Sequence, residues 1–164
     1  MRLLASTDIA LRVLMLLAMQ PPGGHLNVEA LARNLGGLSR NHLHKIVQDL
    51  TAMGVTRTMR GAGGGVMLAV PPEQVPIGTL VRRLEADQPV VECFRPGPCA
   101  CTLMPGCRLR GMLGEAQNSF YASLDGRTLA DCVPRAMRQA ATSTTSDLPT
   151  RSASASTQPP VSST

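Results

Sequence analysis

Aromatic residues are almost missing from this 164-residue chain, which has no Trp, one Tyr and two Phe. Its core must therefore be aliphatic, built from Leu, Val, Met and Ala. Residues 1–70 contain no aromatic residue at all, which disfavours single-stranded or RNA binding by base stacking. Lysine is also scarce: Lys45 is the single lysine, and every other basic residue is an arginine, the residue suited to bidentate contacts with phosphate and guanine.

The chain also lacks a long hydrophobic run. No uninterrupted apolar stretch approaches the ~18 residues that a membrane-spanning helix needs. The N-terminal segment MRLLASTDIALRVLMLLAM starts like a signal peptide, but Asp8 and Arg12 interrupt it and no A-x-A-like cleavage site follows. We therefore expect a cytoplasmic protein with no membrane contact. In that reducing compartment, clustered cysteines favour metal or redox chemistry over structural disulfides.

The formal net charge of +5 is unevenly placed. Residues 1–70 hold seven Lys/Arg against three Asp/Glu, whereas residues 71–135 hold seven of each. The excess positive charge therefore lies in the N-terminal half, where an anionic partner would bind.

Hydrophobic periodicity predicts three helices and a hairpin in this basic half. Ser6 or Thr7 can cap a first helix ending near Met19, Asn27 can cap a second, and Ser39 can cap a third. A glycine pair separates the second helix from the third, and two β-prone runs, 55–59 and 66–70, flank a glycine loop. This order predicts a mainly α fold, a winged helix-turn-helix with a small β-hairpin wing.

In such a fold the third helix enters the major groove of double-stranded DNA. Its outward side chains can donate hydrogen bonds to bases or phosphates, and the wing glycines let the backbone approach a phosphate. The alternative is that these polar residues only solvate a helix face, but the helix pair, the hairpin and the charge asymmetry agree on DNA. The candidate contacts to a DNA operator are Ser39, Arg40, Asn41, His44, Lys45, Gln48, Arg57, Arg60, Gly63 and Gly64.

The C-terminal half is expected to hold a helix over 76–87, a long helix over 108–124 and a last turn near 128–133. The apolar stripe of the long helix exceeds a monomer's needs, so we expect two subunits to pair through it as a homodimer. From about residue 136 the chain is Ser, Thr, Ala and Pro with almost no large apolar residue. The expected units are a DNA-binding domain (1–90), a cysteine loop with the dimerisation helix (91–135), and a disordered tail (136–164).

Four of the five cysteines lie in ECFRPGPCACTLMPGCRLRG, residues 92–111: Cys93, Cys99, Cys101 and Cys107. Cys132 lies apart and is expected to be a small buried residue. The loop lacks the paired C-x₂₋₄-C knuckles of structural zinc, while iron–sulfur clusters accept irregular spacing. A thiol oxidoreductase using Cys99 and Cys101 is a further alternative, but C-x-x-C and a βαβ context are both missing.

Several segments together resemble the NsrR/IscR family of winged-helix repressors that carry an iron–sulfur cluster, and most closely its nitric-oxide-sensing branch. The resemblance covers about residues 1–133. It rests on STDIALRVLMLLA, LSRNHLHKIVQDLTAMG, RGAGGGVMLAVPP, ECF, C-x₂-M-P-G-C-R-L-R and LDGRTLADCV. It implies a regulator that is not an enzyme, and that leaves its operator when nitric oxide reacts with the cluster.

The resemblance also implies a ligand set. Cys93, Cys101 and Cys107 match the family's three cysteines best, and Cys99 in place of Cys101 is the alternative. The resemblance makes Asp8 of the partner subunit the fourth ligand of a 4Fe–4S cluster, with a 2Fe–2S cluster as the other possibility. Without the resemblance, Asp8 would be a helix-terminal carboxylate or would pair with Arg12.

Two departures from the family pattern leave questions open. The turn in ARNLGGLSRNHL is one residue longer than the family pattern, and the extra Cys99 leaves the ligand set open. RLRG follows Cys107 where the IscR branch has a histidine ligand, so that branch fits poorly. The alternative function is a zinc- or iron-responsive winged-helix regulator of the same fold with a different signal.

Overall fold

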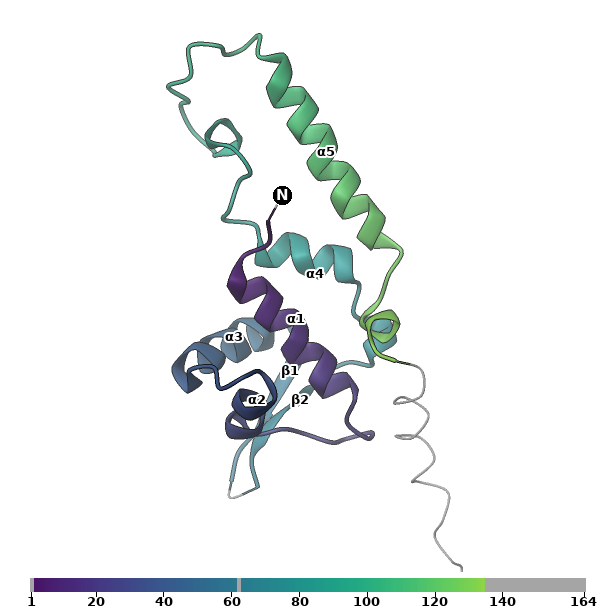
Figure 1. Cartoon of the computed structure of the whole chain (residues 1–164). Helices are drawn as coiled ribbons and strands as arrows, with labels where there is room; N and C mark the ends of the chain where they lie inside the picture. Colours follow the sequence, from purple (N-terminus) through teal and green to yellow (C-terminus); the bar gives the residue numbers. More distant parts are fainter. Residues whose placement is uncertain (1, 62, 135–164) are drawn as a thin grey trace, which may run out of the picture.

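The computed structural model describes residues 2–61 and 63–134 (Figure 1). Helices α1 (Ala5–Ala18), α2 (Val28–Asn34) and α3 (Arg40–Ala52) come first. Strands β1 (Thr56–Met59) and β2 (Gly65–Leu68) and helices α4 (Ile77–Leu84) and α5 (Arg108–Asp125) follow. Short 3₁₀ helices are η1 (Pro72–Gln74), η2 (Glu92–Phe94) and η3 (Leu129–Cys132). The fold is mainly α with one small hairpin, as predicted. The tail predicted over 136–164 lies outside the described residues.

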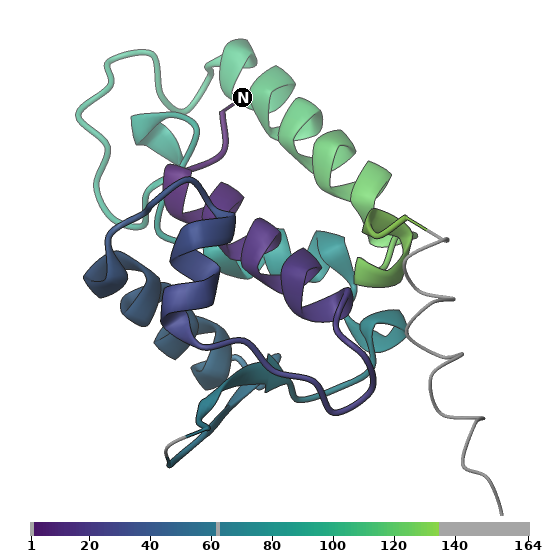
Figure 2. The same ribbon diagram turned by 60° about the horizontal axis from the view of Figure 1, so that its bottom comes forward.

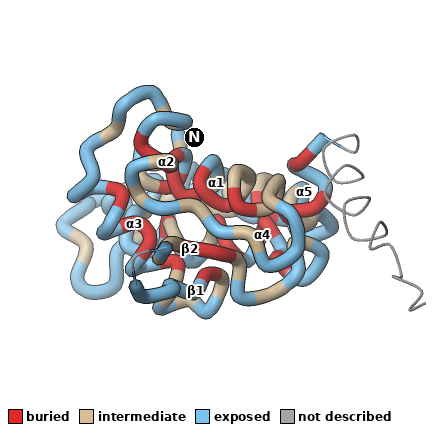
Figure 3. Tube along the Cα trace, turned by 90° about the horizontal axis from the view of Figure 1, so that it is seen from below, coloured by how far each residue is buried: buried red, intermediate tan, exposed pale blue. Residues whose placement is uncertain are grey.

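Helix α1 lies at the centre of the core, packed against α3, β2 and η3. Figure 3 shows buried positions along α1, α3 and β2. The core is aliphatic, as the composition predicts, and Tyr121 is the one buried aromatic residue among those described. Burying a leucine such as Leu14 or Leu31, both 0% exposed, contributes roughly 1.5–3 kcal/mol.

The helix starts differ in how far local sequence determines them. Asn27 caps α2 as predicted, since its Oδ1 accepts a hydrogen bond from the Ala30 N–H at 2.8 Å. Ser39 precedes α3 but makes no side-chain cap bond. The predicted caps of the first helix are wrong: α1 begins at Ala5 after Leu4, and Thr7 is 1% exposed. Thr7 faces the core, so its hydroxyl does not cap the N-terminus of α1.

The turn between α2 and α3 uses both glycines of the predicted pair. Gly36 and Gly37 each have φ of +78°, a conformation that side-chain-bearing residues avoid. The Gly37 N–H donates to the Ala32 carbonyl at 2.8 Å. Two left-handed residues in succession therefore turn the chain sharply and let α2 pack against α3.

The wing is an antiparallel hairpin in which Thr56 pairs with Leu68 and Met59 pairs with Gly65. Its strands lie within two residues of the predicted runs. Leu26 forms an isolated bridge with Val66, through hydrogen bonds of 3.0 and 2.8 Å, and so extends the sheet beside β2. The segment before α2 therefore holds the hairpin against the helices.

The C-terminal end of α5 is fixed to the rest of the fold. Arg82 on α4 makes two hydrogen bonds to Asp125, with Nη2 2.6 Å from Oδ2, and its guanidinium lies 4.9 Å from the centre of the Tyr121 ring. This pairing raises the pKa of Arg82 and lowers that of Asp125. The chain then returns to the core, where the Leu129 N–H donates to the Val75 carbonyl at 2.9 Å.

Gly78 makes this close approach of α4 and α5 possible, and Gly78→Ala is expected to destabilise the fold. A Cβ there would lie 2.9 Å from the Asp125 nitrogen and 3.0 Å from its Cα, so backbone must move. Such overpacking costs roughly 1–3 kcal/mol. Gly111→Ala on α5 is the control, because nothing lies within 4 Å of its Cβ position. Equal unfolding midpoints for the two variants in urea would contradict this packing.

Candidate nucleic-acid interface and cysteine loop

The outward face of α3 carries the predicted reading residues. The helix forms because Leu43, Ile46, Val47 and Leu50 follow helical spacing and are all buried. The opposite positions are therefore held toward solvent. Ser39, Arg40, Asn41, His44, Lys45 and Gln48 are all exposed. The structure brings these six together along one side of a single rigid element.

Two of these cations have exposed partners. Arg40 Nη1 lies 3.0 Å from Glu29 Oε2 on α2, and Lys45 Nζ lies 3.4 Å from Asp49 Oδ1. Pairs as exposed as these contribute about 0–1 kcal/mol each. Both cations can therefore exchange a carboxylate for a DNA phosphate at little cost.

The tip of the wing is open to a close approach. Gly61 has φ of +111°, and its carbonyl accepts the Gly64 N–H at 2.9 Å. A Cβ at Gly64 would meet the Met59 carbonyl oxygen at 2.5 Å, whereas at Gly63 it would meet nothing within 4 Å. Gly64 is thus needed for the turn, while the Cβ position of Gly63 is free, and Arg60 is exposed.

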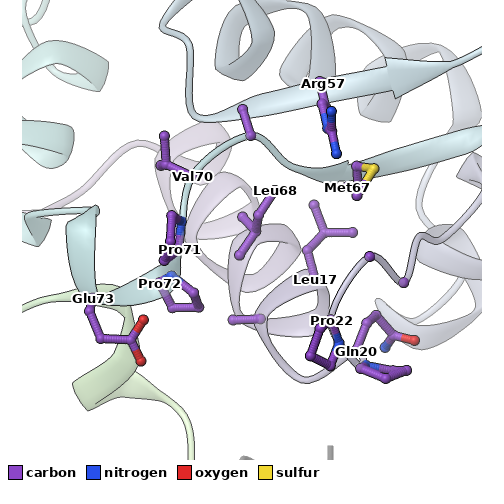
Figure 4. A pocket seen from close by; sticks show the side chains of 15 residues that line it. Leu17, Gln20, Pro22, Arg57, Met67, Leu68, Val70, Pro71, Pro72 and Glu73 are labelled. Carbon is purple, nitrogen blue, oxygen red and sulfur yellow. The ribbon is translucent and has the colours of Figure 1, made fainter. Parts of the chain in front are cut away.

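Arg57 lies lower on the hairpin than the other wing candidates. It is opposite Met67 in the strand register and lines a pocket of about 450 Å³ between the wing and the end of α1 (Figure 4). Most of the lining is apolar: Leu17, Pro22, Met67, Leu68, Val70 and Pro72. The structure therefore separates Arg57 from Arg60, Gly63 and Gly64 at the tip.

The cysteine loop connects α4 to α5, and Cys107 is the N-cap residue of α5. Cys101 is exposed, while Cys93, Cys99 and Cys107 are half-buried. All five cysteines are free thiols, so the donor chemistry of the loop fits an iron–sulfur cluster. Within residues 2–61 and 63–134 of one chain, however, no three Cys, His, Asp or Glu side chains come close enough to hold a metal ion.

Asp8 lies in the first turn of α1 and pairs with Arg12. The Oδ1 atom lies 3.0 Å from Arg12 Nε, and Oδ2 lies 2.9 Å from Nη2. Within one chain Asp8 therefore takes the ion pair that its sequence neighbourhood predicts. The ligand role that the resemblance implies belongs to Asp8 of the partner subunit.

A family model named Rrf2 and described as "Iron-dependent Transcriptional regulator" matches residues 3–135. The chain belongs to the Rrf2 family. Regulators of this family bind DNA and are not enzymes, which rules out the thiol oxidoreductase alternative.

The chain is similar to two transcriptional regulators over most of its length. The HTH-type transcriptional regulator NsrR of Bacillus subtilis (strain 168) is 41% identical over 133 residues, which are 81% of this chain and 90% of that protein. The NsrR of Geobacillus kaustophilus (strain HTA426) is 40% identical over 131 residues, 80% of this chain and 88% of that protein. The match confirms the family expected from the sequence motifs.

Solved structures share the fold. The oxidised form of CymR from Staphylococcus aureus has a TM-score of 0.61 at 25% identity, covering 79% of this chain and 93% of that one. IscR of T. potens has a TM-score of 0.60 at 20% identity, covering 80% of this chain and 85% of that one. Both are consistent with the winged helix-turn-helix expected for an Rrf2 regulator.

Sequence reasoning missed one buried acid in this Rrf2 chain. Glu85 at the end of α4 is 8% exposed, and its Oε1 accepts the Leu4 N–H at 3.0 Å. This bond joins the start of α1, the helix of Asp8, to the point where the cysteine loop begins. Figures 1 and 2 both place the N-terminus on the side of that loop. A glutamate after a helix is typical of a solvated surface, so no local signal identifies it.

Cys132 corrects another expectation. The residue lies at the end of η3 and is exposed overall rather than buried. Its Sγ lies 3.6 Å from the Thr128 carbonyl oxygen, and partial burial there, with the nearby Asp131 carboxylate, raises the pKa of the thiol.

Proposed function

We propose that this protein is a repressor that binds a near-palindromic DNA operator as a homodimer, under the control of an iron–sulfur cluster. The main observation behind this proposal is that one chain has both the exposed polar face of α3 and a loop with four free cysteines before α5. The named relatives and the family description support a DNA-binding regulator linked to iron. We place its action in the cytoplasm; no helix in the described ranges is long and apolar enough to cross a membrane.

The cluster's ligands in this proposal are Cys93, Cys101 and Cys107 of one subunit with Asp8 of the partner subunit. Cys99 is the alternative to Cys101, and 4Fe–4S is favoured over 2Fe–2S. When bound, the cluster supplies iron that reacts with nitric oxide, the proposed signal. Asp8 can contribute because its pair with Arg12 is half exposed, so opening it costs about 1 kcal/mol or less. A carboxylate also holds iron less firmly than a thiolate does.

The protein provides a path from the loop to the reading helix. The start of α1 is fixed by the Leu4–Glu85 hydrogen bond at the base of the cysteine loop. Helix α1 also packs against α3. A shift of the loop or of Asp8 therefore moves the element on which α3 rests, and so changes the spacing of the two reading helices in a dimer.

The dimer in this proposal forms through the N-terminal half of α5. Leu109 is 61% exposed and Met112 is 58% exposed, and both are large apolar side chains on the helix through which two subunits were expected to pair. Tyr121, near the other end of α5, is buried against the fold. A second copy of the chain covers the exposed apolar side chains and brings its own cysteine loop to the same region.

Replacing Leu109 and Met112 by Glu is expected to give a monomer of 17.3 kDa in sedimentation velocity. The monomer should bind the operator on the order of 10²-fold more weakly, because one molecule no longer contacts both half-sites. Glu at the exposed polar positions Asn118 and Ser119 is the matched control. A dimer that survives the double substitution places the interface elsewhere.

Metal analysis of the full chain, purified without oxygen, tests the proposed cofactor. We expect iron and acid-labile sulfide in similar amounts, with absorbance from sulfide-to-iron charge transfer. A colourless protein that retains zinc would contradict the cluster and support the alternative, a zinc-responsive regulator of the same fold. Iron without sulfide would support an iron-responsive one.

A further inference from the structure

An arginine joins the two ends of the cysteine loop. Arg110 lies three residues after Cys107, in the first turn of α5, and its Nε donates to the carbonyl oxygen of Cys93 at 3.2 Å. The two cysteines are 14 positions apart in the chain, so their separation depends on how the loop is closed. This hydrogen bond closes it between the segments that carry them.

The neighbouring residue strengthens the same contact. The Arg110 guanidinium lies 5.5 Å from the centre of the Phe94 ring, within range of a cation–π interaction. The Phe94 Cζ lies 3.8 Å from the Cβ position of Gly114, one turn further along α5. The short helix η2 is thus docked on α5 by a hydrogen bond and by a stacked ring, in a chain with only two phenylalanines.

The other arginines of this region do not make such a bridge. Arg95 pairs with Glu92 at 3.4 Å, within the same short turn. The Arg108 side chain is exposed, and in the described part of the chain it makes no hydrogen bond or ion pair. Charge near the loop is therefore not what distinguishes Arg110; its contact with the Cys93 segment is.

We infer that Arg110 is a positioning residue that holds Cys93 beside Cys107, so that the two thiols can bind the same cluster. The inference rests on the proposed function, because it assigns a task to a residue that is not itself a ligand. Residues that orient metal ligands in this way typically change metal affinity by about 10–100-fold when replaced.

The test compares Arg110→Met with Arg108→Met in the full chain under anaerobic conditions. We expect R110M to release iron to a chelator on the order of 10-fold faster than the wild type. R108M should match the wild type, because it removes the same charge without removing a contact. R110K should retain iron better than R110M but less well than the wild type. Lysine can still donate to the Cys93 carbonyl but cannot stack on Phe94 as a planar group. Visible circular dichroism of the remaining cluster should change in R110M and not in R108M.

A second measurement does not need the cluster. In a chain whose Cys99, Cys101 and Cys132 are replaced by serine, a short bifunctional thiol reagent should bridge Cys93 and Cys107. The bridged fraction should fall in R110M and stay constant in R108M. An unchanged bridged fraction in R110M would overturn the role of Arg110. A wild-type chain without iron and sulfide would instead contradict the proposed function, and the bridging result alone would then decide the role of Arg110.

Discussion

Serine at Cys93 or at Cys107 is expected to remove bound iron and, with it, sequence-specific DNA binding. A serine hydroxyl stays protonated at neutral pH and is a harder donor than a thiolate, so it is a poor substitute on iron. Operator affinity should then fall toward the non-specific level, a loss of about 10³-fold or more. Iron per chain and fluorescence anisotropy on operator DNA measure the two effects.

Single serine variants at Cys99 and Cys101 identify the middle ligand. We expect Cys101→Ser to lose iron and Cys99→Ser to keep it, and the reverse result would assign Cys99. Cys132→Ser is the control, because Cys132 lies on η3 outside the loop. Iron retained in every one of the loop variants would show that the metal is held elsewhere.

Alanine at Arg40 or at Asn41 should remove most of the discrimination between operator and random DNA. Each lost base contact costs roughly 1–3 kcal/mol, and together they should weaken operator binding far more than binding to random sequence. Arg33→Ala is the control, since it removes an exposed cation from α2 rather than from the reading face. Competition titrations with operator DNA and random DNA give the ratio of the two affinities for each variant.

Glu29 supplies a further control for the same face. Its carboxylate pairs with Arg40, so Glu29→Gln frees the guanidinium without altering α3. Discrimination should persist in this variant. Discrimination that survives both Arg40→Ala and Asn41→Ala would instead show that α3 is not the reading helix.

Elements with strong local patterns were predictable from the sequence. The α3 stripe of Leu43, Ile46, Val47 and Leu50 is fixed by helical spacing, and α5 ends within one residue of its prediction. Helix α4 is shorter than the predicted 76–87. It ends before Glu85, whose side chain accepts a hydrogen bond from the Leu4 N–H. A contact across 81 residues leaves no periodic signal in the sequence.

The candidate site divides in the same way. The exposed face of α3 follows from the helix alone, so its residues could be named before the structure was known. The Arg110–Cys93 contact depends on how a loop without repeating pattern folds back on a helix, and spacing does not encode it. The cap of α1 was mispredicted for a related reason: Thr7 has the right local chemistry, but its position in the helical repeat places it in the core.

Operator affinity measured on one anaerobic preparation, before and after titration with nitric oxide, tests the central claim most directly. The proposed function has three loop thiols hold an iron cofactor that sets the spacing of the two DNA-reading helices in a dimer, so we predict tight binding that weakens as nitric oxide is added. Metal-free protein from the same preparation should bind the operator as weakly as the nitric-oxide-treated sample. Equal, tight binding by the loaded, treated and metal-free forms would contradict the account.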